Sequence, residues 1–256
     1  MTERINENSP DLWLSVLPQK TGDQHKYDYG HVLIYGALEL TGATTLAASA
    51  CARIGAGLVT VIAPQDTGSL YRTLLPPHIL VREDPAYDDP RMTARLYGPG
   101  GLAVTPDYKS PCPLILDADA LRDLPAQLPA ETVLTPHEGE FARAFPNLTG
   151  SRTERAQAAA KATGAIIVLK GSETLIAAPD RHATLNRHAS PHLATAGSGD
   201  VLAGLIAGLI GRGMPPYEAA CAAVWIHGDC SLRFGPGLVA ADLPDLIPES
   251  LAALSV

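Results

Sequence analysis

The sequence lacks basic runs, long apolar stretches and a secretion-type leader, and each absence excludes a class of protein. The 256 residues carry a formal net charge of −8 without a Lys/Arg cluster, which argues against a nucleic-acid partner. The longest apolar stretch, residues 201–210, is too short to span a bilayer. Residues 1–12 are polar and acidic, unlike a signal peptide. We therefore expect a cytoplasmic protein that binds neither nucleic acid nor membrane.

Several motifs of common enzyme classes are also missing. The four cysteines form no CxxC pair and lie among apolar or small residues, which indicates buried thiols, with a disulfide left open. The sequence contains no Walker A pattern, no GxSxG elbow, no metal-spaced His/Cys cluster and no GxGxxG fingerprint. An acidic chain can still bind nucleotides, because backbone N–H groups and a metal ion supply positive potential locally.

Short apolar runs alternate with helical segments, which predicts one α/β domain over residues 1–256. A strand at 31–35, an alanine-rich helix at 44–54 and a strand at 58–62 form a βαβ unit. Near-continuous apolar strands predict a mostly parallel central sheet with helices on both faces, in three α/β/α layers. Further strands are expected at 114–116, 132–135, 165–169, 174–177 and 183–185, and further helices at 138–145, 151–163, 200–211, 216–232 and 243–254.

Two stretches fall outside this alternation. Residues 1–30 are polar and contain proline and glycine, so we expect an arm that packs on the domain. Residues 76–100 contain prolines at positions that interrupt any regular element, so we expect loops there.

The turn Gly197-Ser198-Gly199-Asp200, just before a predicted helix, is the sharpest functional signal. Small residues let backbone N–H groups converge, and a helix amino terminus adds partial positive charge, so Gly197, Ser198 and Gly199 predict an anion hole. Asp200 would accept the proton of a hydroxyl that attacks phosphorus, which makes it the candidate catalytic base. The alternative is a plain turn with Asp200 as a cap. Glycines spaced along one face of the following helix favour the functional interpretation.

Two polar segments follow predicted strands, where doubly wound sheets bind ligands. In segment 135–140, His137 is a candidate substrate contact and Glu140 a candidate partner of a metal-bound water. The alternative is that Thr135 and Glu138 cap the next helix and the histidine is merely exposed.

The second of these segments, 116–121, carries two acids two residues apart. Asp117 and Asp119 are candidates to orient the substrate or a hydrated Mg²⁺. The alternative is that one of them caps the following helix.

The turn at residues 170–174 lies between two predicted strands. Lys170 is a candidate contact for nucleotide phosphates, and the backbone and Thr174 hydroxyl are candidate contacts for the rest of a nucleotide. An ordinary hairpin turn is the alternative.

Together these segments resemble the ADP/ATP-dependent (S)-NAD(P)H-hydrate dehydratase family, a branch of the ribokinase-like superfamily, from about Trp13 to Leu251. The resemblance implies repair of (S)-NADHX and (S)-NADPHX, which are hydrated at C6 of the nicotinamide ring, back to NADH and NADPH. ADP or ATP phosphorylates the hydroxyl, with Mg²⁺, and phosphate is eliminated. The matching pieces follow the family order at residues 25–26, 30–34, 41–43, 55–59, 116–121, 134–141, 169–171, 193–204, 227–228 and 240–243.

The resemblance also implies roles for individual residues and partners. Glu140 matches the superfamily acid linked to Mg²⁺. We expect a homo-oligomer and, because no epimerase domain precedes this one, a separate NAD(P)HX epimerase. The implied substrate contacts are Ala43, Gly100, His137 and Asp200, and the implied nucleotide contacts are Lys170, Gly171, Ser172, Glu173, Thr174 and Gly199.

The sequence departs most from the family pattern near Gly100. The family's Gly-Pro-Gly-Leu-Gly segment reads Gly-Pro-Gly-Gly-Leu at 98–102, and only residues 103–116 separate it from Asp117, where a helix and more is expected. This departure bears directly on the substrate contacts.

Two other functions stay open. A ribokinase-like kinase acting on a small alcohol would share the glycine turn, although the 116–121 and 135–140 segments favour the dehydratase. A non-catalytic nucleotide-binding homologue would account for the shortened region, but it needs no base at Asp200. The preference between ADP and ATP, and between NADHX and NADPHX, is not encoded in any pattern found.

Overall fold

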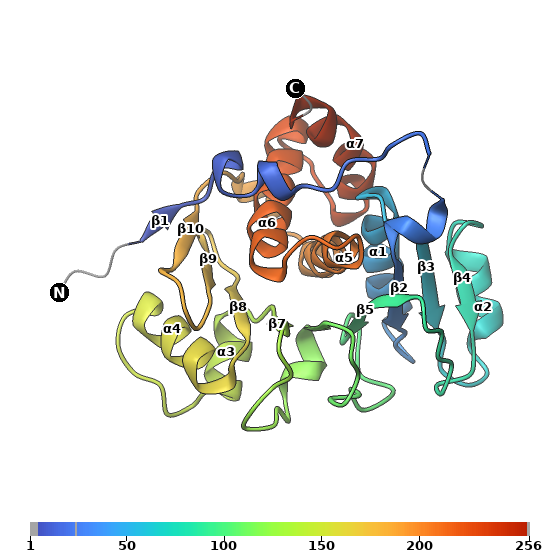
Figure 1. The fold of residues 1–256 in the computed structure, drawn as a ribbon, viewed down its shortest axis with the longest axis horizontal. Helices are drawn as coiled ribbons and strands as arrows, with labels where there is room; N and C mark the ends of the chain where they lie inside the picture. Colours follow the sequence, from blue (N-terminus) through green and yellow to red (C-terminus); the bar gives the residue numbers. More distant parts are fainter. Residues whose placement is uncertain (1–4, 24, 255–256) are drawn as a thin grey trace.

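A computed structural model describes residues 5–23 and 25–254. Within these residues, ten strands form one sheet in the order β1-β10-β9-β8-β7-β6-β5-β2-β3-β4 (Figure 1). Strands β2 to β8 run parallel to one another, and β9 is antiparallel to β8 and β10. The strands are β1 (Asn6–Glu7), β2 (His31–Tyr35), β3 (Leu58–Ile62), β4 (Leu80–Arg82), β5 (Met92–Tyr97), β6 (Leu114–Leu116), β7 (Val133–Leu134), β8 (Ile166–Leu169), β9 (Thr174–Ala177) and β10 (Thr184–Asn186).

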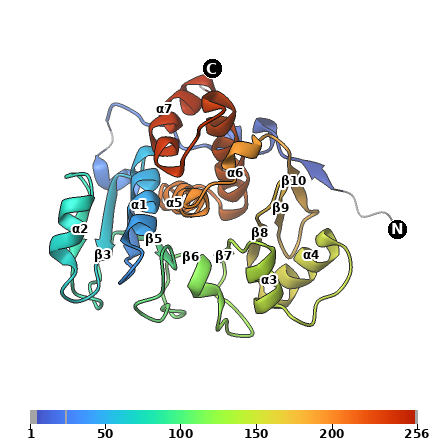
Figure 2. The ribbon, with the colours of Figure 1, turned by 180° about the vertical axis from the view of Figure 1, so that it is seen from behind.

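Helices cover both faces of this sheet, as predicted, which gives three α/β/α layers (Figures 1 and 2). One buried cluster joins α1, α5, α6 and α7 to one sheet face, and a second joins α3 and α4 to the other. None of the helices in the described ranges is long and apolar enough to cross a bilayer. The helices are α1 (Thr41–Arg53), α2 (Gly68–Leu74), α3 (Glu138–Ala144), α4 (Arg152–Thr163), α5 (Ser198–Gly211), α6 (Pro216–Phe234) and α7 (Leu243–Leu254).

Close packing against α1 fixes helix α5 over the sheet. A Cβ atom at Gly204 would lie 2.1 Å from the Ala47 carbonyl oxygen, and one at Gly208 would lie 2.2 Å from a methyl of Ile54. Every residue of α5 from Val201 onward is buried. The glycines therefore serve specific helix packing, and this packing determines where the amino end of α5 points.

The expectation that residues 76–100 form only loops is wrong. This stretch contains β4 and β5, and β5 lies in the middle of the sheet between β2 and β6. The prolines lie outside both strands, so none of them removes an N–H group from the ladder. Helix α2 was also not predicted.

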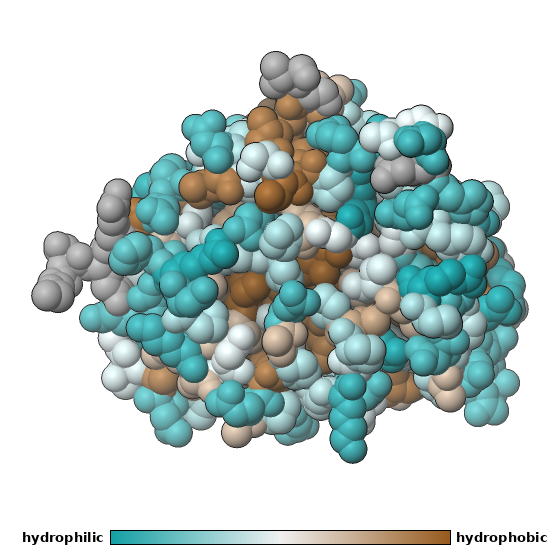
Figure 3. Space-filling view, viewed as in Figure 1, coloured by the Kyte–Doolittle hydropathy of each residue, from teal (hydrophilic) through white to brown (hydrophobic). Residues whose placement is uncertain are grey.

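The expected arm and buried thiols are present in the described residues. Residues 5–23 add β1 parallel to β10, and the fully buried Trp13 packs against Trp225 with ring centroids 5.9 Å apart. All four cysteines are free thiols, three of them buried and Cys112 half-buried. The face drawn in Figure 3 is mostly polar, with apolar surface near the carboxyl-terminal helices.

Candidate functional site

The carboxyl ends of three parallel strands meet the amino end of α5. Asp117 follows β6, Thr135 follows β7 and Lys170 follows β8. Because these strands are parallel neighbours in register, their following residues share one sheet edge. A Cβ atom at Gly199, in the first turn of α5, would lie 3.2 Å from Lys170 Nζ. The anion-hole segment and the charged strand ends therefore form one site.

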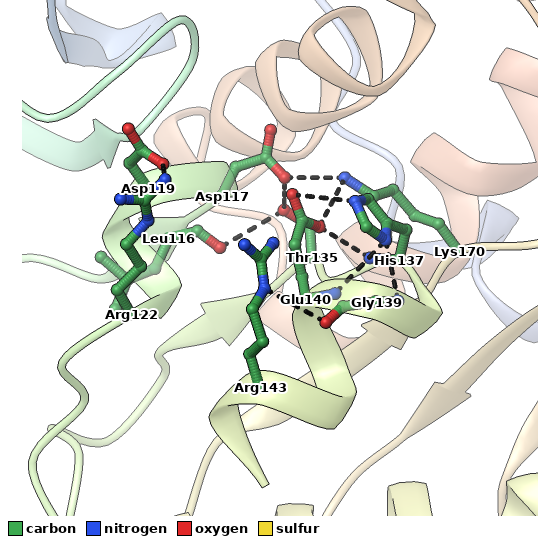
Figure 4. Close-up of polar contacts among 10 residues, drawn as sticks. All are labelled: Leu116, Asp117, Asp119, Arg122, Thr135, His137, Gly139, Glu140, Arg143 and Lys170. Atoms are coloured by element: carbon green, nitrogen blue, oxygen red, sulfur yellow. Dashed lines mark hydrogen bonds and ion pairs between the residues drawn. The ribbon is translucent and has the colours of Figure 1, made fainter. Parts of the chain in front are cut away.

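Asp117 lies at the centre of this site (Figure 4). Its Oδ1 atom accepts hydrogen bonds from Thr135 Oγ1 at 2.7 Å and from Lys170 Nζ at 2.8 Å. Lys170 Nζ also lies 3.8 Å from Glu140 Oε2. Burial alone would lower the pKa of Lys170, but Asp117 and Glu140 outweigh it and raise that pKa. The ammonium group is therefore charged at neutral pH.

Asp200 faces the same cluster from α5. Burial, together with the charges of Asp117 and Glu140 and against the opposing charge of Lys170, raises the pKa of Asp200 to about 7. Asp200 thus shares the Lys170 ammonium with two other acids, and its carboxyl exchanges its proton near neutral pH. A carboxyl that gains and loses its proton in this range is suited to general base catalysis.

The amino end of α5 requires glycine for steric reasons as well as chemical ones. Gly197 is the N-cap residue at φ +92°, and a Cβ atom there would lie 2.6 Å from a methyl of Leu46. The Ser198 hydroxyl donates to the Leu193 carbonyl at 2.8 Å, so it fixes the preceding turn. The anion hole predicted from Gly197, Ser198 and Gly199 therefore has to rely on backbone amides and the helix dipole.

His137 is the N-cap of α3. Its Nδ1 accepts from the Gly139 and Glu140 amides at 2.9 and 3.3 Å, and Glu140 Oε2 accepts from the His137 amide at 2.8 Å. The interpretation that Thr135 and Glu138 cap this helix is wrong, because Thr135 bonds Asp117 and Glu138 pairs with arginines. The His137 side chain is 55% exposed at the edge of the site, so it caps the helix and still faces solvent.

The two acids of the 116–121 segment are separated by the fold. Asp117 is 2% exposed and bonded within the site, whereas the Asp119 side chain is 41% exposed and pairs with Arg122 at 2.7 Å (Figure 4). Neither forms a side-chain cap at the start of the 3-10 turn at Ala118–Leu121. Of these two acids, Asp117 is the one placed to take part in chemistry at the amino end of α5.

The turn between β8 and β9 is held in place by two arginine side chains. Arg152 donates to the carbonyls of Leu169 and Glu173, and Arg187 pairs with the Glu173 carboxylate at 2.8 Å. Gly171, Ser172 and Glu173 are exposed and Thr174 is half-buried. This arrangement places Lys170 inside the charged cluster and presents the rest of the turn to solvent beside it.

Ala43 and Gly100 come together on the other side of Asp117 along the sheet edge. Gly100 has φ +83°, and a Cβ atom there would lie 2.3 Å from the Leu40 carbonyl oxygen and 3.1 Å from Ala43 Cβ. The Thr44 hydroxyl donates to the Pro99 carbonyl at 3.0 Å, which joins the two loops. The described part of residues 103–113 contains no helix, yet the shortened segment keeps Gly100 against Ala43.

His227, which the sequence analysis matched to the family without giving it a role, is a neighbour of the turn before α5. It lies on α6, is 7% exposed, and its ring is hydrogen-bonded to the Ser198 backbone. Within the described residues its Nε2 atom has no partner. Burial lowers the pKa of His227 to about 4, so the ring is neutral and its role toward α5 is packing and hydrogen bonding.

The residues present fit a magnesium ion only if the phosphates of a bound nucleotide supply some of its ligands. No group of three or more His, Cys, Asp or Glu side chains in residues 5–23 and 25–254 is arranged to hold a metal. Mg²⁺ is commonly held by one or two carboxylates together with water and substrate phosphates. Glu140, whose side chain is 11% exposed, and Asp117 are the acids close enough to α5 for that arrangement.

A mostly parallel sheet with a glycine turn and an aspartate at the amino end of a central helix defines a ribokinase-like α/β protein. Ribokinase from Thermotoga maritima shares this fold, with a TM-score of 0.54 and 13% identity over 87% of this chain and 99% of that chain. The chain belongs to the NAD(P)H-hydrate dehydratase family, whose model matches residues 31–251.

Relatives within this family are similar along most of the chain. It is 32% identical to the ADP-dependent (S)-NAD(P)H-hydrate dehydratase of Bacillus subtilis, over 92% of this chain and 94% of the relative. A crystal structure of the Bacillus subtilis ADP/ATP-dependent enzyme, co-crystallised with ATP and Mg²⁺, has a TM-score of 0.87 at 28% identity, covering 98% and 99% of the two chains. The bifunctional NAD(P)H-hydrate repair enzyme of Thermosynechococcus vestitus is 34% identical over 86% of this chain, which spans about half of that relative's length.

Proposed function

We propose that this chain dehydrates (S)-NADHX and (S)-NADPHX to NADH and NADPH at the expense of ADP or ATP. The observation that carries the proposal is the half-buried Asp200 carboxyl, with a pKa of about 7, at the amino end of α5 near the Lys170 ammonium. A base of that strength next to an anion-binding helix end suits transfer of a phosphoryl group to a hydroxyl. The dehydratases of the same family are similar over the whole site region.

In the first step the C6 hydroxyl of the hydrated nicotinamide becomes a phosphate ester. Asp200 takes the hydroxyl proton while the oxygen attacks the terminal phosphorus of ADP or ATP. The bond from that phosphorus to the bridging oxygen breaks, and AMP or ADP leaves. The amides of residues 197–199 and the Lys170 ammonium stabilise the negative charge of the transferred group.

In the second step phosphate leaves. The C6–O bond breaks, a proton is lost from C5, and the C5–C6 double bond of the reduced nicotinamide returns. A hydroxyl leaves poorly and a phosphate leaves readily, so phosphorylation is what makes the elimination possible. Magnesium bound with the nucleotide would offset phosphate charge, with Glu140 as its partner through water.

The sheet order supports an arrangement of the two ligands. The nucleotide residues Lys170, Gly171, Ser172, Glu173 and Thr174 follow β8, whereas Ala43, Gly100 and His137 follow β2, β5 and β7. The amino end of α5 lies between these groups, with Gly199 beside Lys170 and Gly197 beside Leu46 of α1, and His137 stands at the boundary because it pairs with Lys170. The nucleotide and the hydrated cofactor would therefore approach from opposite sides and meet at α5.

The test is an assay of NADH absorbance and phosphate release from purified (S)-NADHX, with ADP or ATP and Mg²⁺. We expect NADH and phosphate in equal amounts, and none without nucleotide. Folded protein that forms no NADH with either nucleotide would contradict the proposal. Accumulation of a stable phosphorylated NADHX would identify the kinase alternative, and nucleotide binding without turnover the non-catalytic one.

The predicted homo-oligomer, cytoplasmic location and separate epimerase belong to this proposal. Light scattering coupled to size-exclusion chromatography measures the first. A requirement for added epimerase when (R)-NADHX is the substrate would support the third.

A further inference from the structure

Asp117 carries no role in the resemblance to the dehydratases, yet it is the most buried acid of the site. Its side chain is 3% exposed, and the single oxygen Oδ1 accepts from both Thr135 and Lys170. The Thr135 amide also donates to the Leu116 carbonyl at 3.1 Å, so the backbones that hold these partners are joined. Asp117 is therefore a rigidly placed carboxylate.

Lys170 is the group that needs such a partner. A lysine side chain has a flexible stem and a compact charge, so its ammonium takes the position that nearby groups give it. The Lys170 backbone is fixed by its amide, which donates to the Pro136 carbonyl at 2.8 Å, while the head group is 2.8 Å from Asp117 and 3.8 Å from Glu140. The short contact with Asp117 is the one that sets the direction of the side chain.

Stability alone does not explain this pair. A buried ion pair contributes little to folding, because the cost of removing both charges from water offsets their attraction. The pair also lies where a phosphoryl group is expected, with Nζ 3.2 Å from the position of a Gly199 Cβ. The missing side chain at Gly199 gives the ammonium access to the first turn of α5.

The groups around Lys170 show what would happen without Asp117. Acids interact with the ammonium from the residue after β6 (Asp117), from α3 (Glu140) and from α5 (Asp200), and the neutral His227 lies on α6 within its electrostatic reach. With Asp117 removed, the remaining attraction comes from Glu140 and Asp200. The ammonium would then move toward Asp200 and away from the incoming phosphate.

We propose that Asp117 is a positioning residue that holds the Lys170 ammonium against the amino end of α5, within reach of the transferred phosphoryl group and apart from the base Asp200. This inference rests on the proposed function for its chemistry. Its geometry can be tested through nucleotide binding alone.

The experiment compares Asp117→Asn with Asp119→Asn, which removes a charge two residues away on the surface. Asp117→Asn is expected to lower kcat at least about tenfold, or about 1.4 kcal/mol, and to raise the KM for ADP while the KM for (S)-NADHX stays within about twofold. Asp119→Asn is expected to stay near wild type in all three constants. Equal kinetics for Asp117→Asn and Asp119→Asn would overturn the proposal.

A double-mutant cycle shows whether Asp117 acts through Lys170. If it does, Asp117→Asn combined with Lys170→Met is no slower than Lys170→Met alone, because the positioned group is already gone. Losses that multiply in the double variant would contradict the proposal.

Binding of ADP with Mg²⁺, measured by calorimetry, separates this inference from the proposed function. If wild-type protein binds ADP but never forms NADH, the dehydratase function fails, and an ADP affinity lowered at least about tenfold in Asp117→Asn still supports the positioning role. Unchanged ADP affinity would overturn it.

Should Asp117→Asn fail to fold, Thr135→Val removes one hydrogen bond to the same oxygen and is expected to shift ADP affinity in the same direction by less. No shift in Thr135→Val would then count against the proposal.

Discussion

The half of the sheet formed by β6 to β8 and the half that contains β2 and β5 differ in the elements that cover them. At the carboxyl ends of β6 to β8, the polar and charged groups are bonded to one another beside the amino end of α5, and α3 and α4 pack on this face of the sheet. Beneath β2 and β5, the described loops at 83–91 and 98–113 take the place of a helix (Figure 2). The first half carries the residues proposed to do the chemistry, and the second carries the shortened segment.

A polar layer lies under those loops. The Tyr35 and Tyr97 rings stack with centroids 4.1 Å apart, and Arg95, 9% exposed in its side chain, pairs with Asp88 at 3.0 Å. In the described residues Arg95 Nε has no partner, and a cavity of about 300 Å³ remains beside this side chain. The polar residues of one half are therefore fixed by hydrogen bonds to one another, whereas the other half is covered by loops that leave a cavity beside Arg95.

The largest expected effect is that of Asp200→Asn. Without a base at α5, kcat should fall at least about 10³-fold while ADP binding stays near wild type. Single-turnover kinetics with calorimetry of ADP checks both. A kcat within tenfold of wild type would mean that the chemistry does not depend on this half of the sheet.

The pH dependence is the next largest effect. Asp200 must be ionised to accept a proton, so kcat should fall as pH drops through about 7, by about tenfold per unit at lower pH. The sign for stability is opposite, because a pKa raised from 3.8 favours the protonated folded state, and that contribution is lost as pH rises through 7. Asp200→Asn should therefore raise Tm at pH 8 relative to wild type. Flat profiles of kcat between pH 5 and 8 would contradict the raised pKa.

Gly100→Ala addresses the loop-covered half. A Cβ atom there would press on the Leu40 carbonyl at 2.3 Å in a left-handed backbone conformation, which displaces the loop that meets Ala43. The KM for (S)-NADHX should rise about tenfold, with the KM for ADP unchanged. An equal rise in both KM values would show that the two sides of the site are not separable.

The smallest effect is expected for Arg95→Met, in the polar layer. Its acidic partners Asp88 and Asp107 are 75% and 50% exposed, so both are hydrated when the arginine is gone. We expect a loss of stability of about 1 kcal/mol or less and kcat within twofold of wild type, checked by urea unfolding and the NADHX assay. A tenfold loss of kcat would link this layer to the chemistry.

The parts of the fold that follow from local pattern were predictable. The apolar runs at His31–Tyr35 and Leu58–Ile62 became β2 and β3 at the predicted bounds, and the glycine turn before α5 lies at a helix amino end. Strand β5 was missed because Arg95 breaks its apolar run and prolines stand on either side. A central strand that carries a polar side chain such as Arg95 does not show the continuous apolar pattern expected of a buried strand.

The hydrogen bonds and ion pairs within the site were not predictable from the sequence. Nothing local distinguishes Asp117 from Asp119, since a single residue separates them and only the direction of the chain after β6 turns one inward. The bonds from Thr135 and Lys170 to Asp117 depend on three strands being neighbours, which is a property of the sheet. The roles assigned to individual site residues stay predictions.

One measurement tests the central claim most directly. If (S)-NADHX carries heavy oxygen in its C6 hydroxyl, phosphorylation of that hydroxyl with Asp200 as the base, followed by elimination, must transfer that oxygen to the released phosphate. We predict one heavy oxygen in each phosphate formed with ADP or ATP, detected by mass spectrometry. Heavy oxygen recovered in water, with NADH formed and unlabelled phosphate, would contradict the account.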